Sequence, residues 1–169
     1  MKCPRKLLAL VLLQVAFLPG IAAAQVILKL HGDLVTSTNY SPQQFAQLPH
    51  TDIAYQRRIE AAGAPEVSKV SYRGVLLKDL LARAGMDDRQ RRDFRRAVVI
   101  VRAADGYVAI FTWGELFNTD VGKHVLVVRE IDGRPLPQSE GALALRSFSD
   151  HRPGPRHVRL MTEIEVRAF

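Results

Sequence analysis

The longest run of apolar and β-branched residues after the N-terminus spans 97–113, and an Asp-Gly pair interrupts it near its middle. β-Branched and aromatic side chains favour strands, and Asp-Gly tolerates the positive φ of a tight reversal. The pattern predicts antiparallel strands over 97–102 and 107–112, joined by a turn at 104–106. Because the first strand is apolar at nearly every position, we expect it to be central in its sheet and covered on both faces.

Shorter apolar segments predict further strands at 26–32, 67–72, 124–128, 141–146 and 158–166. Asp132-Gly133 predicts a second tight turn. Residues 36–40 are polar and typical of a turn, and 149–156 form a basic loop interrupted by proline.

Two short helices are also predicted. The first begins at Pro42, with Ser41 as N-cap and Gln44 three residues later, a capping-box pattern. The second spans 74–85, with leucines at helical spacing and Gly85 at its end. A helix is one interpretation of 55–62, and 114–117 is typical of a helical turn. The charged segment 86–96 is interpreted as a helical turn or surface loop. The fold class predicted is α+β: one mixed, sheet-rich domain with short helices.

The first 24 residues have the pattern of a secretory signal peptide, which leaves 25–169 as the mature domain. Three basic residues precede an apolar stretch at 7–18, and three alanines at 22–24 precede Gln25. That stretch is too short for a membrane-spanning helix. We therefore expect a periplasmic protein that does not span the membrane after signal cleavage.

Signal cleavage changes both the charge and the cysteine content. The net charge falls from +7 to +4, because three of the 24 lysines and arginines leave while all 17 acidic residues stay. This modest charge argues against a nucleic-acid binder. The arginine-rich run 89–96 alternates with aspartates, which predicts a self-paired surface. Cys3 is the one cysteine, so the mature chain has no disulfide, no thiolate metal ligand and no cysteine nucleophile.

The order of four segments carries a family resemblance: 72–81, 104–107, 132–136, and 150–159 with 164–166. Together they resemble the molybdopterin-binding domain of the sulfite oxidase family, and in particular small exported members that consist of this domain alone. The resemblance covers roughly 26–167. It implies sheets and short helices around a buried pterin cleft, with a pterin as the cofactor.

Enzymes of that family hold molybdenum through one cysteine thiolate upstream of the helix at 74–81. Here the corresponding region, 50–71, contains no cysteine, which argues against molybdenum bound in that way. The five histidines show no zinc-site spacing on a predicted helix. Ser149, Asp150 and His151 are the residue types of a hydrolase triad, but three neighbours in one loop do not make one. We predict no catalytic residue and no metal ligand.

The candidate binding residues come from two places. Trp113, beside Gly114 at a strand end, and the preceding Tyr107 offer flat faces to a heterocycle; the alternative is that they are core and rim aromatics. The resemblance implies that Arg152, Arg156 and His157 hold the anionic cofactor. The alternative there is a solvated basic loop, or pairing with Asp150 and Glu163.

These observations favour an exported, non-catalytic binding protein for a pterin or similar small heterocyclic anion, which signals to a membrane protein. One alternative is a molybdopterin-dependent oxidoreductase in which an oxygen ligand replaces sulfur. The other is a structural or adaptor module whose cleft is vestigial and filled by side chains.

Overall fold

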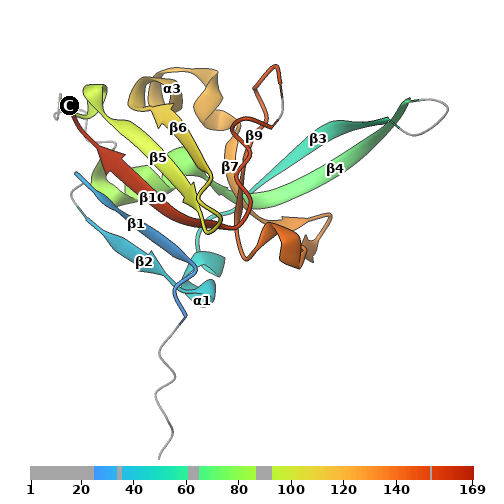
Figure 1. The fold of residues 1–169 in the computed structure, drawn as a ribbon, viewed down its shortest axis with the longest axis horizontal. Helices are drawn as coiled ribbons and strands as arrows, with labels where there is room; N and C mark the ends of the chain where they lie inside the picture. Colours follow the sequence, from blue (N-terminus) through green and yellow to red (C-terminus); the bar gives the residue numbers. More distant parts are fainter. Residues whose placement is uncertain (1–24, 34–35, 61–64, 87–92, 153) are drawn as a thin grey trace, which may run out of the picture.

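The computed structural model describes residues 25–33, 36–60, 65–86, 93–152 and 154–169, which form two five-stranded sheets and several short helices (Figure 1). In the first sheet the strand order is β2 (Thr38–Tyr40), β1 (Leu28–Gly32), β10 (Met161–Arg167), β5 (Val98–Ala103) and β6 (Val108–Thr112). In the second it is β3 (Thr51–Glu60), β4 (Pro65–Leu76), β7 (Val125–Ile131) and β8 (Arg134–Pro135), and β9 (Ala144–Ser147) also pairs with β7. The predicted sheet-rich α+β fold is confirmed.

Short helices connect and cover these strands. They are α1 (Pro42–Ala46), α2 (Leu77–Leu81), η1 (Ala82–Met86), η2 (Asp93–Arg96), α3 (Trp113–Asn118), η3 (Asp120–Lys123) and η4 (Gln138–Glu140). Within the described ranges, no helix has the length and apolar character needed to cross a bilayer.

The predicted hairpin is confirmed as β5 and β6. Gly106 adopts φ 88°, its amide donates to the Ala103 carbonyl over 3.1 Å, and the Asp105 carboxylate accepts from the Tyr107 amide. The expected cover of β5 is complete on one face and partial on the other. Val99, Val101 and Ala103 lie in the core. On the opposite face Ile100 is buried, whereas Arg102 is half-buried and pairs with Glu165 at 2.8 Å.

Both predicted helices are present. Ser41 and Gln44 form the capping box of α1. Leu77, Leu80 and Leu81 of α2 are fully buried, and Gly85 has φ 97°. The predicted start of the second helix was too early: Gly74 lies within β4, where a Cβ atom would come 2.0 Å from the Val127 carbonyl oxygen. Glycine there allows β4 and β7 to approach closely.

Two predictions of local structure were wrong. Residues 36–40 contain the strand β2, which pairs with β1, and 55–60 belong to strand β3 rather than to a helix. The local pattern of 55–62 suits either structure, and β4 supplies an antiparallel partner along the whole of β3. Tertiary pairing therefore overrides the local signal. The predicted signal peptide (1–24), residues 61–62 and residues 87–92, which include the first half of the arginine-rich run 89–96, lie outside the described residues.

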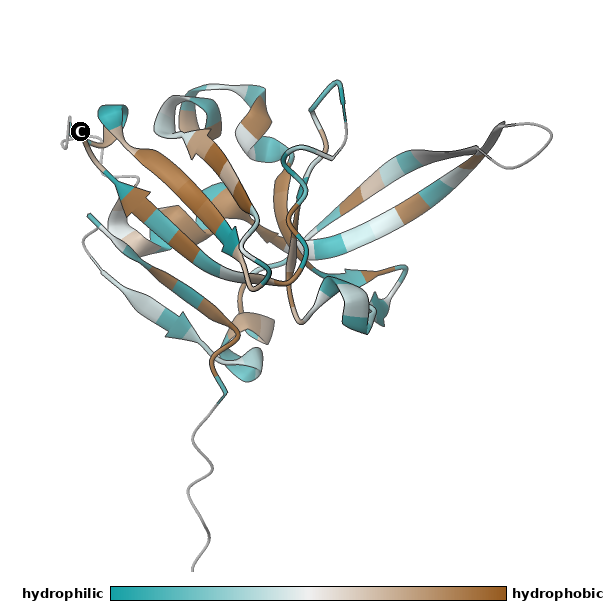
Figure 2. Cartoon of the chain, viewed as in Figure 1, coloured by the Kyte–Doolittle hydropathy of each residue, from teal (hydrophilic) through white to brown (hydrophobic). Residues whose placement is uncertain are grey.

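The main core lies between the two sheets, and apolar residues concentrate on β5, β6, β7 and β10 (Figure 2). A smaller apolar cluster is centred on Tyr72, Leu126 and Val128, with Tyr55 and Phe148 packed against it. Beyond this cluster, no strand among the described residues pairs with the β3–β4 hairpin, because β4 pairs with β7 only from Tyr72 to Leu76. The hairpin projects from the body as a two-stranded ribbon (Figure 1).

Candidate ligand-binding cavity

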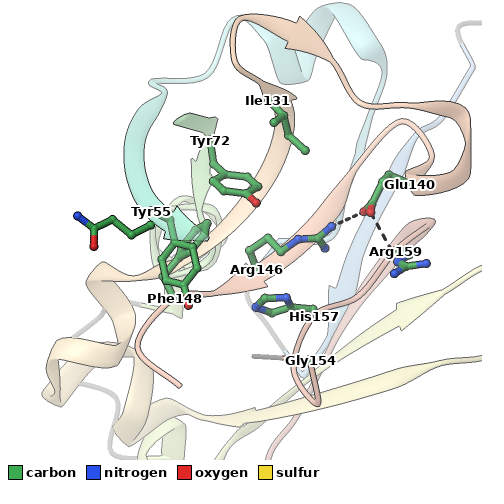
Figure 3. A pocket seen from close by; sticks show the side chains of 10 residues that line it. Tyr55, Tyr72, Ile131, Glu140, Arg146, Phe148, Gly154, His157 and Arg159 are labelled. Atoms are coloured by element: carbon green, nitrogen blue, oxygen red, sulfur yellow. Dashed lines mark hydrogen bonds and ion pairs between the residues drawn. The ribbon is translucent and has the colours of Figure 1, made fainter. Parts of the chain in front are cut away.

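A cavity of about 440 Å³ lies between the base of the β3–β4 hairpin and the segment that follows β9 (Figure 3). Aromatic, charged and small residues contribute to its lining, which consists of Tyr55, Gln56, Tyr72, Ile131, Glu140, Arg146, Phe148, Gly154, His157 and Arg159. Its volume lies within the range of small-molecule sites.

One side of the cavity is aromatic, and we call Tyr55, Tyr72 and Phe148 the aromatic wall. The Phe148 ring centroid lies 5.3 Å from that of Tyr55 and 5.0 Å from that of Tyr72, both in tilted geometry. Tyr72 pairs in register with Ile53, and Tyr55 with Val70, so the two tyrosines are diagonal neighbours on one face of the hairpin. Phe148 directly follows β9. The wall therefore depends on two separate strand pairings.

The facing side carries charge, and we call Glu140, Arg146 and Arg159 the Glu140 cluster (Figure 3). The Arg146 guanidinium pairs with the Glu140 carboxylate and donates to its neighbour's carbonyl, that of Leu145, at 3.0 Å. Arg159 Nε lies 3.5 Å from Glu140 Oε1. The side chain of Arg146 is 9% exposed and that of Arg159 is 69% exposed. One cation is therefore fixed and the other is free to move.

His157 completes the lining as a neutral imidazole. Burial lowers the pKa of His157, and the positive charge of Arg146 lowers it further. Its Nε2 lies 3.3 Å from the carbonyl oxygen of Ser147, which can only accept a hydrogen bond. In the neutral ring this Nε2 carries the proton and Nδ1 is left as an acceptor.

Arg156 is oriented toward protein carboxylates and is not among the lining residues. Its guanidinium bonds to both oxygens of Asp150, pairs with Glu115 at 2.9 Å, and lies 4.7 Å from the centroid of the Phe111 ring. Pairing with Asp150 was the alternative to cofactor binding that the sequence left open for this loop. Glu163, the other suggested partner, pairs instead with His31 at 2.9 Å.

Tyr107, Arg152 and Trp113 are not among the lining residues either. The Tyr107 hydroxyl donates to the Pro155 carbonyl at 2.7 Å, and Arg152 is exposed. Trp113 stacks on Phe117, with ring centroids 5.4 Å apart, and its Nε1 donates to the Met86 carbonyl. Of the five residues predicted to bind, His157 alone lines the cavity; a binding role for the other four stays a prediction.

The sequence interpretation missed the aromatic wall and Glu140. A signal existed: Val70 and Tyr72 alternate with polar residues, and Ile53 and Tyr55 alternate with the smaller or polar residues Asp52, Ala54 and Gln56, as on a strand with one covered face. Interpreting 55–62 as helical separated Tyr55 from Tyr72. Glu140 is a single acidic residue in a turn, and no local pattern marks it.

The lining residues fit a planar ring with an anionic group, but not a metal held by thiolate. Aromatic faces suit stacking, and arginine suits a carboxylate or phosphate. No cysteine occurs after Cys3. In the ranges that the structure describes, no three His, Cys, Asp or Glu residues gather as a metal-binding group. The chemistry of this cavity therefore suits the organic part of a pterin.

Comparison with known proteins gives the family. No curated protein sequence matches the chain. Among solved structures, the sulfane dehydrogenase SoxCD from Paracoccus pantotrophus is similar, with a TM-score of 0.61 and 15% identity. The likeness covers 83% of this chain and 38% of that one, and at this identity it shows the fold alone. The sequence profile of the oxidoreductase molybdopterin binding domain matches residues 16–169, so the chain belongs to this family.

Proposed function

We propose that this chain is an exported, non-catalytic binding protein for a pterin or a similar small heterocyclic anion. The carrying observation is the cavity itself, in which the aromatic wall faces the Glu140 cluster. A cleft filled by side chains, as in the adaptor alternative, does not leave about 440 Å³ of space. The absence of cysteine after Cys3 is what favours binding over molybdenum chemistry.

In the proposed complex the ligand ring stacks against the aromatic wall. Its anionic group lies toward Arg159, which is the more exposed cation, and the buried Arg146 adds a second positive charge to the lining. When the His157 imidazole is neutral, its Nδ1 accepts a hydrogen bond from a ring N–H, and when the imidazole is protonated, Nδ1 donates to the ligand's anionic group instead. Stacking supplies affinity with little preference among planar rings, and the polar groups supply orientation.

Titration calorimetry with pterin, pterin-6-carboxylate and their reduced forms tests this proposal directly. The expected result is binding of one ligand per chain by at least one of them. No heat and no thermal shift with any of the four would overturn it. Stoichiometric molybdenum in protein made by a cofactor-competent host would instead support the oxidoreductase alternative. Export is tested by periplasmic fractionation and by an N-terminus at Gln25.

Binding of an anionic pterin is expected to strengthen about three- to tenfold as the pH falls from 7 to 5. The pKa of free His157 lies below its ordinary value of about 6.5. An adjacent anion raises this pKa in the complex, so binding takes up a proton between the two pKa values. His157→Gln should remove the dependence, and His151→Gln, at an exposed position, should retain it. Calorimetry from pH 5 to 8 would contradict this if His157→Gln kept the full dependence.

We further propose that the β3–β4 hairpin reports occupancy to a membrane partner. Tyr55 and Tyr72 line the cavity at its base, and Val67 farther along is 57% exposed. An unsupported two-stranded ribbon is marginally stable, so a ligand on the aromatic wall should slow amide exchange at 67–71 about tenfold. Val67→Glu should bind ligand normally but lose co-sedimentation with host membranes. Unchanged exchange on ligand addition would contradict the coupling.

A further inference from the structure

We propose that Glu140 is a specificity-determining residue, which competes with the ligand's anionic group for Arg159 and so limits the cavity to ligands with a single negative charge. This inference rests on the proposed function and deepens it. It concerns how much charge the ligand carries, whereas the proposed function concerns only its planar ring and its anionic character.

The Glu140 carboxylate is shared by two guanidinium groups that are held very differently. Arg146 is buried and has a second partner, the Leu145 carbonyl, so it stays in place. Arg159 is mostly exposed, and its 3.5 Å approach to Glu140 is the one ion pair that the structure gives it among the described residues. An anion entering the cavity can therefore draw Arg159 away from Glu140 without disturbing Arg146.

The charge balance of the lining sets the limit. Arg146 and Arg159 contribute two positive charges, Glu140 contributes one negative charge, and His157 is neutral near pH 7. A ligand with one negative charge brings the lining to neutrality. A second negative charge would be partly desolvated without a partner, which is costly, and it would also lie near the Glu140 carboxylate.

Arginine suits the exchange of partners. Its guanidinium forms parallel hydrogen bonds with a carboxylate, and its long side chain lets it change partner without backbone movement. In the unliganded protein the contact with Glu140 keeps Arg159 at the cavity. The same contact must be broken when the ligand binds, which lowers the affinity for every anionic ligand.

Three pterins that differ only in the charge at position 6 provide the test: hydroxymethyl (neutral), carboxylate (one charge) and hydroxymethyl phosphate (close to two charges at pH 8). The wild type should prefer the carboxylate to the phosphate. Glu140→Gln keeps the shape of the side chain. It should increase the affinity for the phosphate at least tenfold and change the affinity for the neutral pterin by less than twofold. This would reverse or abolish the preference.

Arg159→Gln provides an independent test, because an exposed side chain can be replaced without disturbing the fold. It should lower the affinity for pterin-6-carboxylate about tenfold and change the affinity for the neutral pterin by less than twofold. If the wild type binds pterins but both variants keep its ratios among the three, the inference is overturned and the proposed function stands. If the wild type binds none of the three, the proposed function fails and this inference fails with it.

Discussion

Phe148→Leu is expected to weaken pterin binding at least tenfold, whereas Trp113→Leu should leave it within twofold. Phe148 lies between Tyr55 and Tyr72 in the aromatic wall, with centroids about 5 Å from each. Stacking of a heterocycle on an aromatic side chain contributes about 1–3 kcal/mol, and leucine keeps the apolar character but loses the flat face. Calorimetry with pterin-6-carboxylate measures the change.

The comparison with Trp113 decides between two locations for the ligand. Trp113 was the stacking residue predicted from the sequence, but in the structure its ring packs on Phe117 and its Nε1 is bonded to the Met86 carbonyl. Phe117→Leu, which alters that stack at the neighbouring ring, is the matched control and should bind as the wild type does. If Trp113→Leu lost binding and Phe148→Leu retained it, the ligand would bind at the tryptophan and not in the cavity.

The second large effect concerns stability. Arg156→Gln is expected to lower the free energy of unfolding at pH 7 by about 3 kcal/mol, because it leaves two carboxylates without their shared cation. The Asp150 side chain is only 12% exposed, and Glu115 lies at the first turn of α3. Urea denaturation measures the difference. Arg152→Gln, which removes an exposed charge from the same loop, should change the value by less than about 0.5 kcal/mol.

The same network predicts how stability depends on pH. Burial by itself would raise the pKa of Asp150, but hydrogen bonds from Arg156 and Ser147 outweigh it and hold that pKa below its usual range. For Glu115, hydrogen bonds from Thr112 and Arg156 likewise outweigh burial and lower the pKa. Both carboxyls therefore stabilise the fold above their unfolded pKa values of about 4, and this contribution is lost as the pH falls through the lower folded values.

In the wild type, the free energy of unfolding should accordingly fall below about pH 5. Arg156→Gln should show a shallower fall over the same interval, because the folded pKa values of Asp150 and Glu115 move back toward their unfolded values. Urea titrations at pH 7, 5, 4 and 3 measure both slopes. An equally steep fall in the two proteins would show that Arg156 does not control these carboxyls.

Turns and helices that depend only on residues close together in the sequence were predictable. The Asp-Gly turn of β5 and β6, the capping box of α1 and the leucines of α2 depend on neighbours in the chain, and the structure has all three. The order of such elements was enough to give the family, which the sequence profile supports. The missing cysteine after Cys3 is also a property of the sequence alone.

The cavity depended on pairings between distant segments. Strand β3 exists because β4 lies beside it, and Tyr55 comes close to Tyr72 only in that register. Phe148 joins them because β9 pairs with β7. The sequence placed cations in the last loop, but it did not determine that Arg156 bonds to Asp150 and Glu115 while Arg159 remains exposed at the cavity.

The sequence by itself therefore determined the local elements, the family and the absence of a thiolate after residue 3, because each follows from residue types and short spacings. The tertiary structure alone decided which aromatic rings share a wall and which arginines face open space. The physical reason is that side-chain direction alternates along a strand, so a change of one residue in register, or of strand for helix, moves a residue from the cavity to the surface.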